Sequence, residues 1–427
     1  MSTLQQLLQA LETGGYNDRL SALYGREGTP AARERAIRVT QKLGEQFAPA
    51  GNAALFSGPG RTEIGGNHTD HQHGRALCGS VDMDMLACAA PNGLRVVRID
   101  SEGYPLLEID LDDLTLKEEE KNTSAALVRG VAAKIEELGY PLSGFDACAT
   151  STVLSGSGIS SSAAYETLVA NIFNYFCCGG RLDPVTIAKV GQYAENVYFG
   201  KPCGLLDQMG SSVGGAVFLD FKDPAEPIVE QVNFDFSRCG HTLCIVDTCS
   251  SHDDLTDDYA AITREMGAVA AHFGKTVLRD VPETDFRREL PALREECGDR
   301  AVLRAIHFYG DDRRAAQEAQ ALKDGDFARF LSLVNASGLS SSLCLQNTWS
   351  VSNTRQQAVP LTLELGRELL EGTGAIRVHG GGFAGTIQAF VPNEKLDRFK
   401  AGMEALLGKG KCHILHIRPQ GGCVVAE

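Results

Sequence analysis

Serine and glycine dominate residues 155–162, which read Ser-Gly-Ser-Gly-Ile-Ser-Ser-Ser and follow a strand-like segment that begins at Phe145. Glycines let backbone amides approach an anion, and a helix starting after them adds free N–H groups and the positive end of its dipole. The segment lacks both the lysine of a Walker A loop and the third glycine of a dinucleotide fingerprint. It therefore indicates either a phosphate-binding loop or an ordinary strand-to-helix turn with a serine cap.

A second segment, Gly58–His71, spaces an arginine, an asparagine, two histidines and an aspartate among four glycines. If this segment is extended, His68 and Asp70 face the same side because they are two residues apart. Such side chains could bond the hydroxyls of a polyol, and Arg61 could stabilise negative charge. The alternatives are a polar surface loop and a metal site. A metal site is disfavoured because its ligands would alternate in direction and would have no partner cluster elsewhere in the sequence; those ligands would be His68, Asp70, His71 and His73.

Two further segments combine small residues with polar ones. Asp207 follows Cys-Gly-Leu-Leu, an arrangement that could position a reactive carboxylate, although an aspartate in such a place is more often a helix cap. Later in the chain, Gly380, Gly382 and Gly385 satisfy the spacing of a dinucleotide motif. A strand rather than a helix is expected after them, so they indicate close approach of the backbone to a ligand or to another loop.

Hydrophobic periodicity predicts the elements that position these segments. Helices are expected in the first fifty residues and at 122–139, 163–176, 183–199, 251–345, 360–370 and 395–407, and strands at 53–112, 145–154, 215–220, 241–247, 375–378, 385–390 and 413–417. Residues 222–227 (Lys-Asp-Pro-Ala-Glu-Pro) would break either element type. The sequence therefore predicts a mixed α+β chain in two parts, residues 1–235 and 236–427.

Composition limits the partners and the compartment. The chain has 40 basic and 55 acidic residues, a formal net charge of −15, which disfavours nucleic acid and anionic membrane as partners. It has no apolar run long enough to span a bilayer, and its N-terminus lacks the layout of a secretory signal. The thirteen cysteines are scattered, without metal-site spacing, so reduced thiols in a cytoplasmic protein are expected.

In their order along the chain, the four segments resemble the galactokinase branch of the GHMP small-molecule kinase superfamily. The resemblance extends from about Phe56 to Pro392. It implies two α+β domains, the first like domain 2 of ribosomal protein S5 and the second ferredoxin-like, with the active site between them. It also implies ATP and Mg²⁺ as cofactors and transfer of a phosphoryl group to the C1 hydroxyl of galactose.

The resemblance assigns roles to particular residues. Asp207 matches the catalytic aspartate and Arg61 its partner, and a carboxylate kept ionised by an arginine suits proton removal from an acceptor hydroxyl. Ser162 and Glu195 match the ligands of Mg²⁺, a hard cation that prefers oxygen. The expected ATP contacts are Gly156, Ser157, Gly158, Ser160, Ser161 and Ser162. The expected sugar contacts are Asn67, His68, Asp70, Gly204 and Tyr259.

Because this sequence departs from the family pattern at several positions, the identity of the substrate sugar is not fixed by the resemblance. The signature usually has Glu where this sequence has Asn67, Asn where it has Glu63, and Tyr where it has His71; His71-Gln72 is similar to the plant galacturonate-kinase branch. Leu154 and His379 replace a common Pro and Thr. Because uncharged Asn67 would not repel an anionic sugar, galacturonate is an alternative substrate. A non-catalytic sensor of sugar and ATP is an alternative of another class, and a mevalonate- or homoserine-type kinase is disfavoured because it would not carry the Gly60–Asp70 segment.

Overall fold

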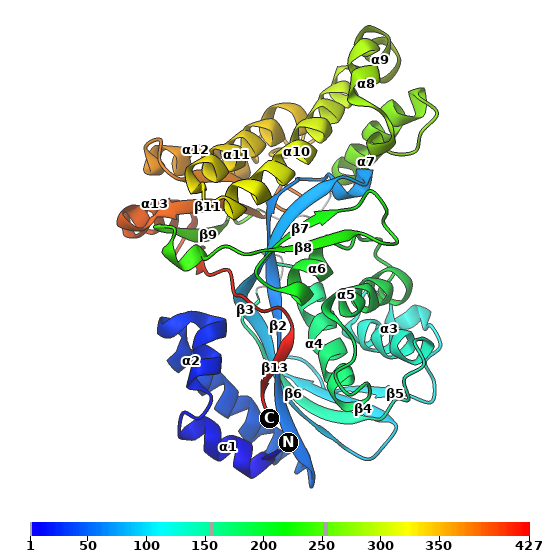
Figure 1. The fold of residues 1–427 in the computed structure, drawn as a ribbon, viewed down its shortest axis with the longest axis vertical. Coiled ribbons are helices and arrows are strands. Elements are labelled where there is room, and N and C mark those ends of the chain that lie inside the picture. The colour runs from blue at the N-terminus through cyan, green and yellow to red at the C-terminus, as the bar shows by residue number, and fades with distance from the viewer. Residues whose placement is uncertain (1, 154–157, 251–254) are drawn as a thin grey trace.

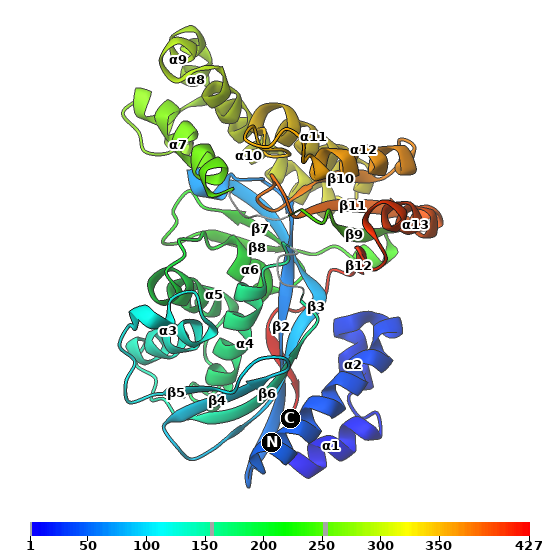
Figure 2. The same cartoon turned by 180° about the vertical axis from the view of Figure 1, so that it is seen from behind.

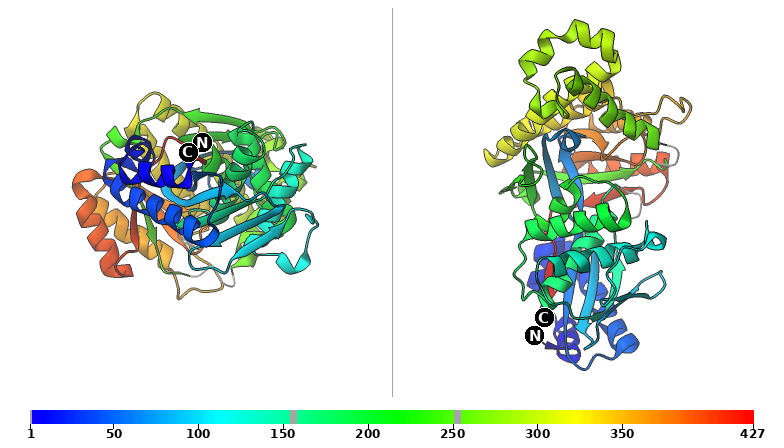
Figure 3. Two further views of the ribbon diagram at one scale, coloured as in Figure 1. Left: turned by 90° about the horizontal axis from the view of Figure 1, so that it is seen from below. Right: turned by 90° about the vertical axis from the view of Figure 1, so that its right-hand side faces the viewer.

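The computed structural model describes residues 2–153, 158–250 and 255–427. Within these ranges the chain is elongated, and two β-sheets with their helices follow one another along the long axis (Figures 1 and 3). The two chain termini lie together at one end of the molecule (Figure 1). No helix in the described ranges is long and apolar enough to cross a membrane.

A long antiparallel hairpin forms the centre of the first sheet and runs along the molecule (Figure 1). Its strands are β2 (Asn52–Gly65) and β3 (Arg75–Pro91). The sheet order is β1-β2-β3-β6-β4-β5, with β13 beside β2, β7 beside β3 and β8 beside β7. These strands are β1 (Ser2–Thr3), β4 (Val96–Ser101), β5 (Leu107–Asp110), β6 (Phe145–Ser151), β7 (Ala216–Asp220), β8 (Ile228–Val232) and β13 (Cys423–Ala426).

Helices cover both faces of the first sheet, which explains why its central strands β2, β3 and β6 are mostly buried on both sides. One face packs on α1 (Leu4–Glu12) and α2 (Asn17–Phe47), and the other on α3 (Ser124–Glu137), α4 (Ser161–Phe176) and α5 (Pro184–Tyr193). Ala53 and Leu55 belong to the core under the first pair, whereas Ala54 and Phe56 belong to the core under the other three. This alternation is the period of two that a strand imposes.

The second sheet is antiparallel and has the order β10-β11-β9-β12. Its strands are β9 (His241–Asp247), β10 (Ala375–His379), β11 (Thr386–Pro392) and β12 (Cys412–Leu415). One face packs on α12 (Ala358–Leu370) and α13 (Leu396–Leu407), and the other on α10 (Asp299–Lys323) and α11 (Phe327–Ser340). Figure 2 shows this sheet and its helices above the first sheet.

The remaining helices complete the far end and the middle of the molecule. Helices α7 (Thr256–His272), α8 (Glu283–Arg288) and α9 (Leu290–Cys297) pack with α10 around a core of their own. Helix α6 (Leu206–Val213) packs against β2 and β3. Short 3-10 or π-helical turns occur at η1 (Asp70–Gln72), η2 (Glu118–Glu120), η3 (Ala194–Phe199), η4 (Phe236–Arg238), η5 (Leu278–Asp280), η6 (Ser341–Leu345) and η7 (Asn393–Lys395).

The predicted α+β class is confirmed, and most elements lie where periodicity predicts them. The glycine-containing stretch from Gly58, within the range of predicted strands but with a polar surface loop as the alternative, is strand β2 as far as Gly65. The sequence prediction missed α6, β8 and β13. The division near residue 235 stays a prediction; the second sheet lies entirely after it, while β13 at the C-terminal end returns to the first sheet.

Candidate active site

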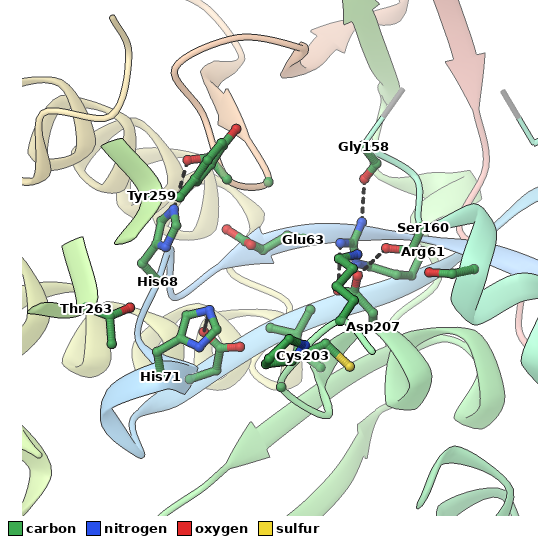
Figure 4. Close-up of a pocket in the computed structure, with 18 of the residues that line it drawn as sticks. Arg61, Glu63, His68, His71, Gly158, Ser160, Cys203, Asp207, Tyr259 and Thr263 are labelled. Atoms are coloured by element: carbon green, nitrogen blue, oxygen red, sulfur yellow. Dashed lines mark hydrogen bonds and ion pairs between the residues drawn. The ribbon is translucent and has the colours of Figure 1, made fainter. Parts of the chain in front are cut away.

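Segments from both parts of the chain line a cavity of about 920 Å³ (Figure 4). Strand β2 and the turn after it contribute one wall, and the start of α4 together with residues 201–207 contributes another. Helix α7 and the Gly380–Gly381 turn complete the lining. The cavity therefore gathers residues from all four segments in which the sequence predicted chemistry.

Asp207 stands in the first turn of α6 and makes an ion pair with Arg61 of β2. The Arg61 Nε donates to the Asp207 Oδ1 at 2.7 Å, and the Ser160 hydroxyl donates to Oδ2 (Figure 4). Burial alone would raise the pKa of Asp207, but Arg61 and Ser160 outweigh it and the pKa is lowered. The helix N-terminus also favours negative charge there. The structure thus holds an ionised carboxylate at the cavity.

The two residues predicted to bind a metal ion are hydrogen-bonded to each other. The Ser162 hydroxyl donates to Glu195 Oε1 at 3.0 Å, and Gln208 donates to the other oxygen of that carboxylate at 2.8 Å. Lys201 reaches the same Oε1 at 3.1 Å and lines the cavity. Among the described residues, no group of three or more histidine, cysteine or acidic side chains has metal-site geometry. One carboxylate and one hydroxyl suit Mg²⁺, which keeps several waters.

The described part of the predicted phosphate loop leads into α4. Gly158, Ser160, Ser161 and Ser162 line the cavity. Gly156 and Ser157, also predicted to contact ATP, lie outside the described residues. Gly158 has a φ of 70°, and a Cβ there would stand 2.9 Å from the Thr386 hydroxyl. A glycine is therefore required on both conformational and steric grounds.

A second cavity, of about 400 Å³, shares Ser161 and Ser162 with the first. Its other walls are largely apolar, with contributions from Met85, Ile99, Leu107, Leu127 and Phe199 among others. An apolar pocket that adjoins a phosphate loop suits a nucleobase and its ribose.

Four of the five predicted sugar-binding residues line the first cavity: His68, Asp70, Gly204 and Tyr259. His68 has a φ of 56° and Asp70 opens η1, so they are not on an extended segment as expected, yet both reach the cavity. Burial lowers the pKa of His68 to about 4, so its ring is neutral, and its Nε2 lies 2.8 Å from the Gly381 carbonyl oxygen. A Cβ on Gly204 would stand 2.5 Å from the Asp70 carboxylate, which explains the glycine.

Two described site residues are not part of the cavity lining: Glu195, which lies behind Ser162, and Asn67. The side chain of Asn67 is fully buried and is not part of the lining, so its predicted contact with the sugar is not supported by its place in the structure. The Asn67 amide instead donates to Glu63 Oε1 at 2.9 Å and to the Gly380 carbonyl oxygen at 2.8 Å. Glu63, which the sequence did not propose as a site residue, lines the cavity in its place (Figure 4).

Sequence reasoning missed Glu63 and Lys201 as cavity residues. Glu63 could have been found from Arg61, since side chains two residues apart on a strand share a face, but the sequence left a surface loop as an alternative for this stretch. Lys201 carried no signal beyond its place between Glu195 and Asp207. Its amino group supplies a cation on the side of the cavity that faces the serine residues.

Two family models match the chain. The model described as GHMP kinases N terminal domain matches residues 126–215, and the model described as galactokinase galactose-binding signature matches residues 41–91. The first range contains the serine loop, Glu195 and Asp207, and the second contains Arg61, Glu63 and the turn after β2. The matches therefore cover the walls formed by β2 with its following turn and by the start of α4 with residues 201–207, but not α7 or the Gly380–Gly381 turn.

Curated relatives match over most of the chain. A galactokinase of Streptomyces coelicolor is 30% identical over 372 residues, which cover 86% of this chain and 92% of that protein. A galactokinase of Glaesserella parasuis is 28% identical over 376 residues, which cover 85% of this chain and 92% of that protein.

Solved structures share the fold. The structure of Lactococcus lactis galactokinase complexed with galactose has a TM-score of 0.74 at 22% identity, and covers 90% of this chain and 98% of its own. The Methanococcus jannaschii mevalonate kinase has a TM-score of 0.61 at 13% identity, and covers 86% of this chain and 99% of its own.

The fold and the site together define a small-molecule kinase of the GHMP class, which implies ATP as the phosphoryl donor. Within that class, the chain belongs to the galactokinase family. The family predicted from the four segments is thereby confirmed.

Proposed function

We propose that this chain transfers the γ-phosphoryl group of ATP to the C1 hydroxyl of galactose, with Mg²⁺ bound at Ser162 and Glu195. The observation that carries the proposal is the ionised Asp207, which shares one cavity with Arg61, the serine residues at the start of α4 and four predicted sugar contacts. Phosphoryl transfer depends mainly on alignment and charge stabilisation, and this arrangement supplies both.

Asp207 acts on the acceptor. One of its oxygens faces Arg61 and the other accepts from Ser160, so the carboxylate is fixed in direction. A carboxylate with a lowered pKa is a weak base in the ground state. It orients the sugar hydroxyl and takes its proton late, when the bond to phosphorus is already forming and the hydroxyl has become acidic.

Several positive groups stabilise the negative charge of the transferring phosphoryl group. The guanidinium of Arg61 is bonded to Asp207 and to the Gly158 carbonyl oxygen, which fixes it between the acceptor side and the loop. The N-terminus of α4 adds its dipole, and Lys201 adds a cation whose side chain is 60% exposed. Mg²⁺, when bound, would neutralise phosphate oxygens beside Ser162 and Glu195.

The nucleoside of ATP occupies the second cavity in this proposal. Sharing Ser161 and Ser162, the two cavities meet where the phosphates must lie, with the base on one side and the sugar on the other. We also place the protein in the cytoplasm, since all thirteen cysteines, each within the described ranges, are free thiols.

Product analysis tests the proposal. The purified protein is incubated with ATP, Mg²⁺ and galactose, ADP release is measured, and the sugar product is examined by phosphorus NMR. We expect a sugar phosphate whose phosphorus couples to the anomeric proton. Binding of both galactose and ATP without ADP release would instead identify a sensor and contradict the proposal.

A further inference from the structure

Glu63 and Asn67 exchange the residue types that the family signature usually has at these positions, and the two side chains are hydrogen-bonded to each other. The carboxylate of Glu63 stands in the cavity wall between Arg61 on one side and His68 on the other (Figure 4). Its Oε1 accepts from Asn67 at 2.9 Å and from Arg377 at 3.0 Å. Its Oε2 has no hydrogen-bond partner within the described part of the chain, so one carboxylate oxygen remains for a ligand.

Strand geometry sets the distance between Glu63 and the reaction centre. Arg61, Thr62 and Glu63 pair consecutively with Ser80, Gly79 and Cys78, so no bulge interrupts the alternation between them. Arg61 and Glu63 therefore share the cavity face, roughly 6.5 Å apart along β2. That separation is close to the span of a pyranose ring. A sugar whose C1 hydroxyl meets Asp207, the partner of Arg61, and that extends along β2 would present its far end to Glu63.

The surroundings of Asn67 explain why this chain has no carboxylate at position 67, where the family signature usually has Glu. Its backbone N–H donates to the buried Asp311 carboxylate at 2.8 Å, and Asp311 is already paired with Arg314. Its side-chain amide donates to Glu63 and to the Gly380 carbonyl oxygen, both of which are acceptors. A carboxylate at this position could not donate to either and would add uncompensated charge to a buried acidic cluster. An amide is required at position 67, and Glu63 carries the charge.

We propose that Glu63 is the specificity-determining residue for the sugar, accepting a hydrogen bond from a hydroxyl at C3, C4 or C6, with Asn67 and Arg377 as its positioning residues. This inference rests on the proposed function and narrows it. A carboxylate in the wall accepts from a neutral sugar and repels an anionic one. The site therefore takes a neutral hexose and rejects galacturonate, the alternative that Asn67 left open.

The test compares Glu63→Gln with the wild type on galactose, galacturonate and the 2-, 3-, 4- and 6-deoxygalactoses, using ADP release for kcat and KM. Loss of a hydrogen bond to a charged group predicts a KM for galactose that rises by about 10-fold or more, with a smaller change in kcat. The preference for galactose over galacturonate should fall. For one sugar deoxygenated at C3, C4 or C6 the effect of the substitution should vanish, whereas it should persist for 2-deoxygalactose.

A double variant separates recognition from folding. Glu63→Gln combined with Asn67→Asp keeps the net charge and lets the new glutamine donate to the new aspartate, which reverses the original hydrogen bond. We expect it to regain only part of the melting temperature lost by Glu63→Gln, because the aspartate cannot donate to the Gly380 carbonyl oxygen, and not to regain the KM. Glu368→Gln, the same chemical change on an exposed face of α12, is the matched control and should leave both unchanged.

Three results would overturn the inference. They are an unchanged KM in Glu63→Gln, an equal penalty on every deoxygenated sugar, and recovery of KM in the double variant. Absence of ADP release from wild type with galactose would contradict the proposed function instead. In that case calorimetric titration with galactose decides: weaker binding by Glu63→Gln supports the role of Glu63, and equal binding overturns it.

Discussion

At the scale of single residues, the cavity separates two carboxylates by their environments. Arg61 and Ser160 keep the pKa of Asp207 low in spite of burial. Burial raises the pKa of Glu63 to about 7, although Arg377 and Arg61 oppose the rise. One carboxylate is thus fixed in the ionised form for chemistry, and the other titrates near neutrality, where it contacts the sugar in our proposal.

This difference predicts a pH dependence of sugar use. As the pH falls through about 7, Glu63 gains a proton and loses the charge that accepts from the hydroxyl and repels a uronate. Galactose kcat/KM should therefore decline on the acid side of pH 7, and the preference over galacturonate should decline with it. Measuring kcat/KM for both sugars between pH 5.5 and 8.5, about one and a half pH units on either side of the pKa of Glu63, checks this prediction.

Glu63→Gln should lose the acid limb of that profile. The charged or titratable groups around Glu63 are Arg61 on its own strand, Arg377 and His379 on β10, Asp70 in η1 and Glu318 on α10. His71 also lines the cavity, so His71→Gln is the control, and it should keep the limb. A limb that survives Glu63→Gln but disappears in His71→Gln would assign the titration to the histidine instead.

At the scale of elements, strand β2 shows what a sequence can and cannot predict. The stretch from Gly58 lies where strands are predicted, but its glycines left a polar surface loop as an alternative; the structure forms a strand there and shows why the glycines are present. A Cβ on Gly58 would stand 2.3 Å from the Ala164 carbonyl oxygen, and one on Gly60 would stand 2.4 Å from the Ile159 side chain. Glycines in this strand admit the segment leading into α4, a neighbour about a hundred residues later that local patterns do not reveal.

The reaction centre could be predicted better than the sugar end. Arg61, Ser162, Glu195 and Asp207 carry motifs whose order along the chain is informative, and the structure brings them to one site. The place of Asn67 could not be predicted, because it depends on the packing of Asp311, Ser341 and Asn347 from distant elements around the turn after β2.

The close approach of residues 201–205 to η1 predicts the effect of Gly204→Ala. The added Cβ would meet the Asp70 carboxylate at 2.5 Å and move it within the cavity. We expect the KM for galactose to rise by about 10-fold or more, which is the scale of one lost charged hydrogen bond, with the KM for ATP little changed. Gly267→Ala in α7 has open space around it and is the control. A wild-type KM in Gly204→Ala would contradict the contact.

At the scale of the whole molecule, the C-terminal segment ties the two sheets together. After β12 in the second sheet, the chain returns to pair β13 with β2 of the first. On the way, fully buried Arg418 donates to the Ser57 hydroxyl at 2.8 Å and lies 3.6 Å from the Asp84 carboxylate. The same carboxylate accepts from Tyr24 and Arg35 of α2, so helix, hairpin and C-terminal segment meet at one buried charge cluster.

The substitution Arg418→Met tests how much this buried charge cluster contributes to the free energy of unfolding. Removing one partner from a buried charge network costs about 3–5 kcal/mol in the free energy of unfolding. We expect a loss of that size in urea unfolding, with kcat and KM of the folded protein unchanged, since Arg418 is not part of the cavity lining. The matched control is Arg355→Met, which alters an exposed arginine. Equal unfolding free energies for the two variants would show that the cluster contributes little.

The central claim, that Asp207 is the reaction centre of a galactose kinase, is tested most directly by Asp207→Asn. Calorimetry should show that the variant still binds galactose and ATP, while ADP release falls by about 10²- to 10⁴-fold, the usual contribution of a positioned acid or base. Asp223→Asn, on an exposed loop, is the control and should turn over normally. Turnover near the wild-type rate in Asp207→Asn, with galactose 1-phosphate as product, would contradict the account.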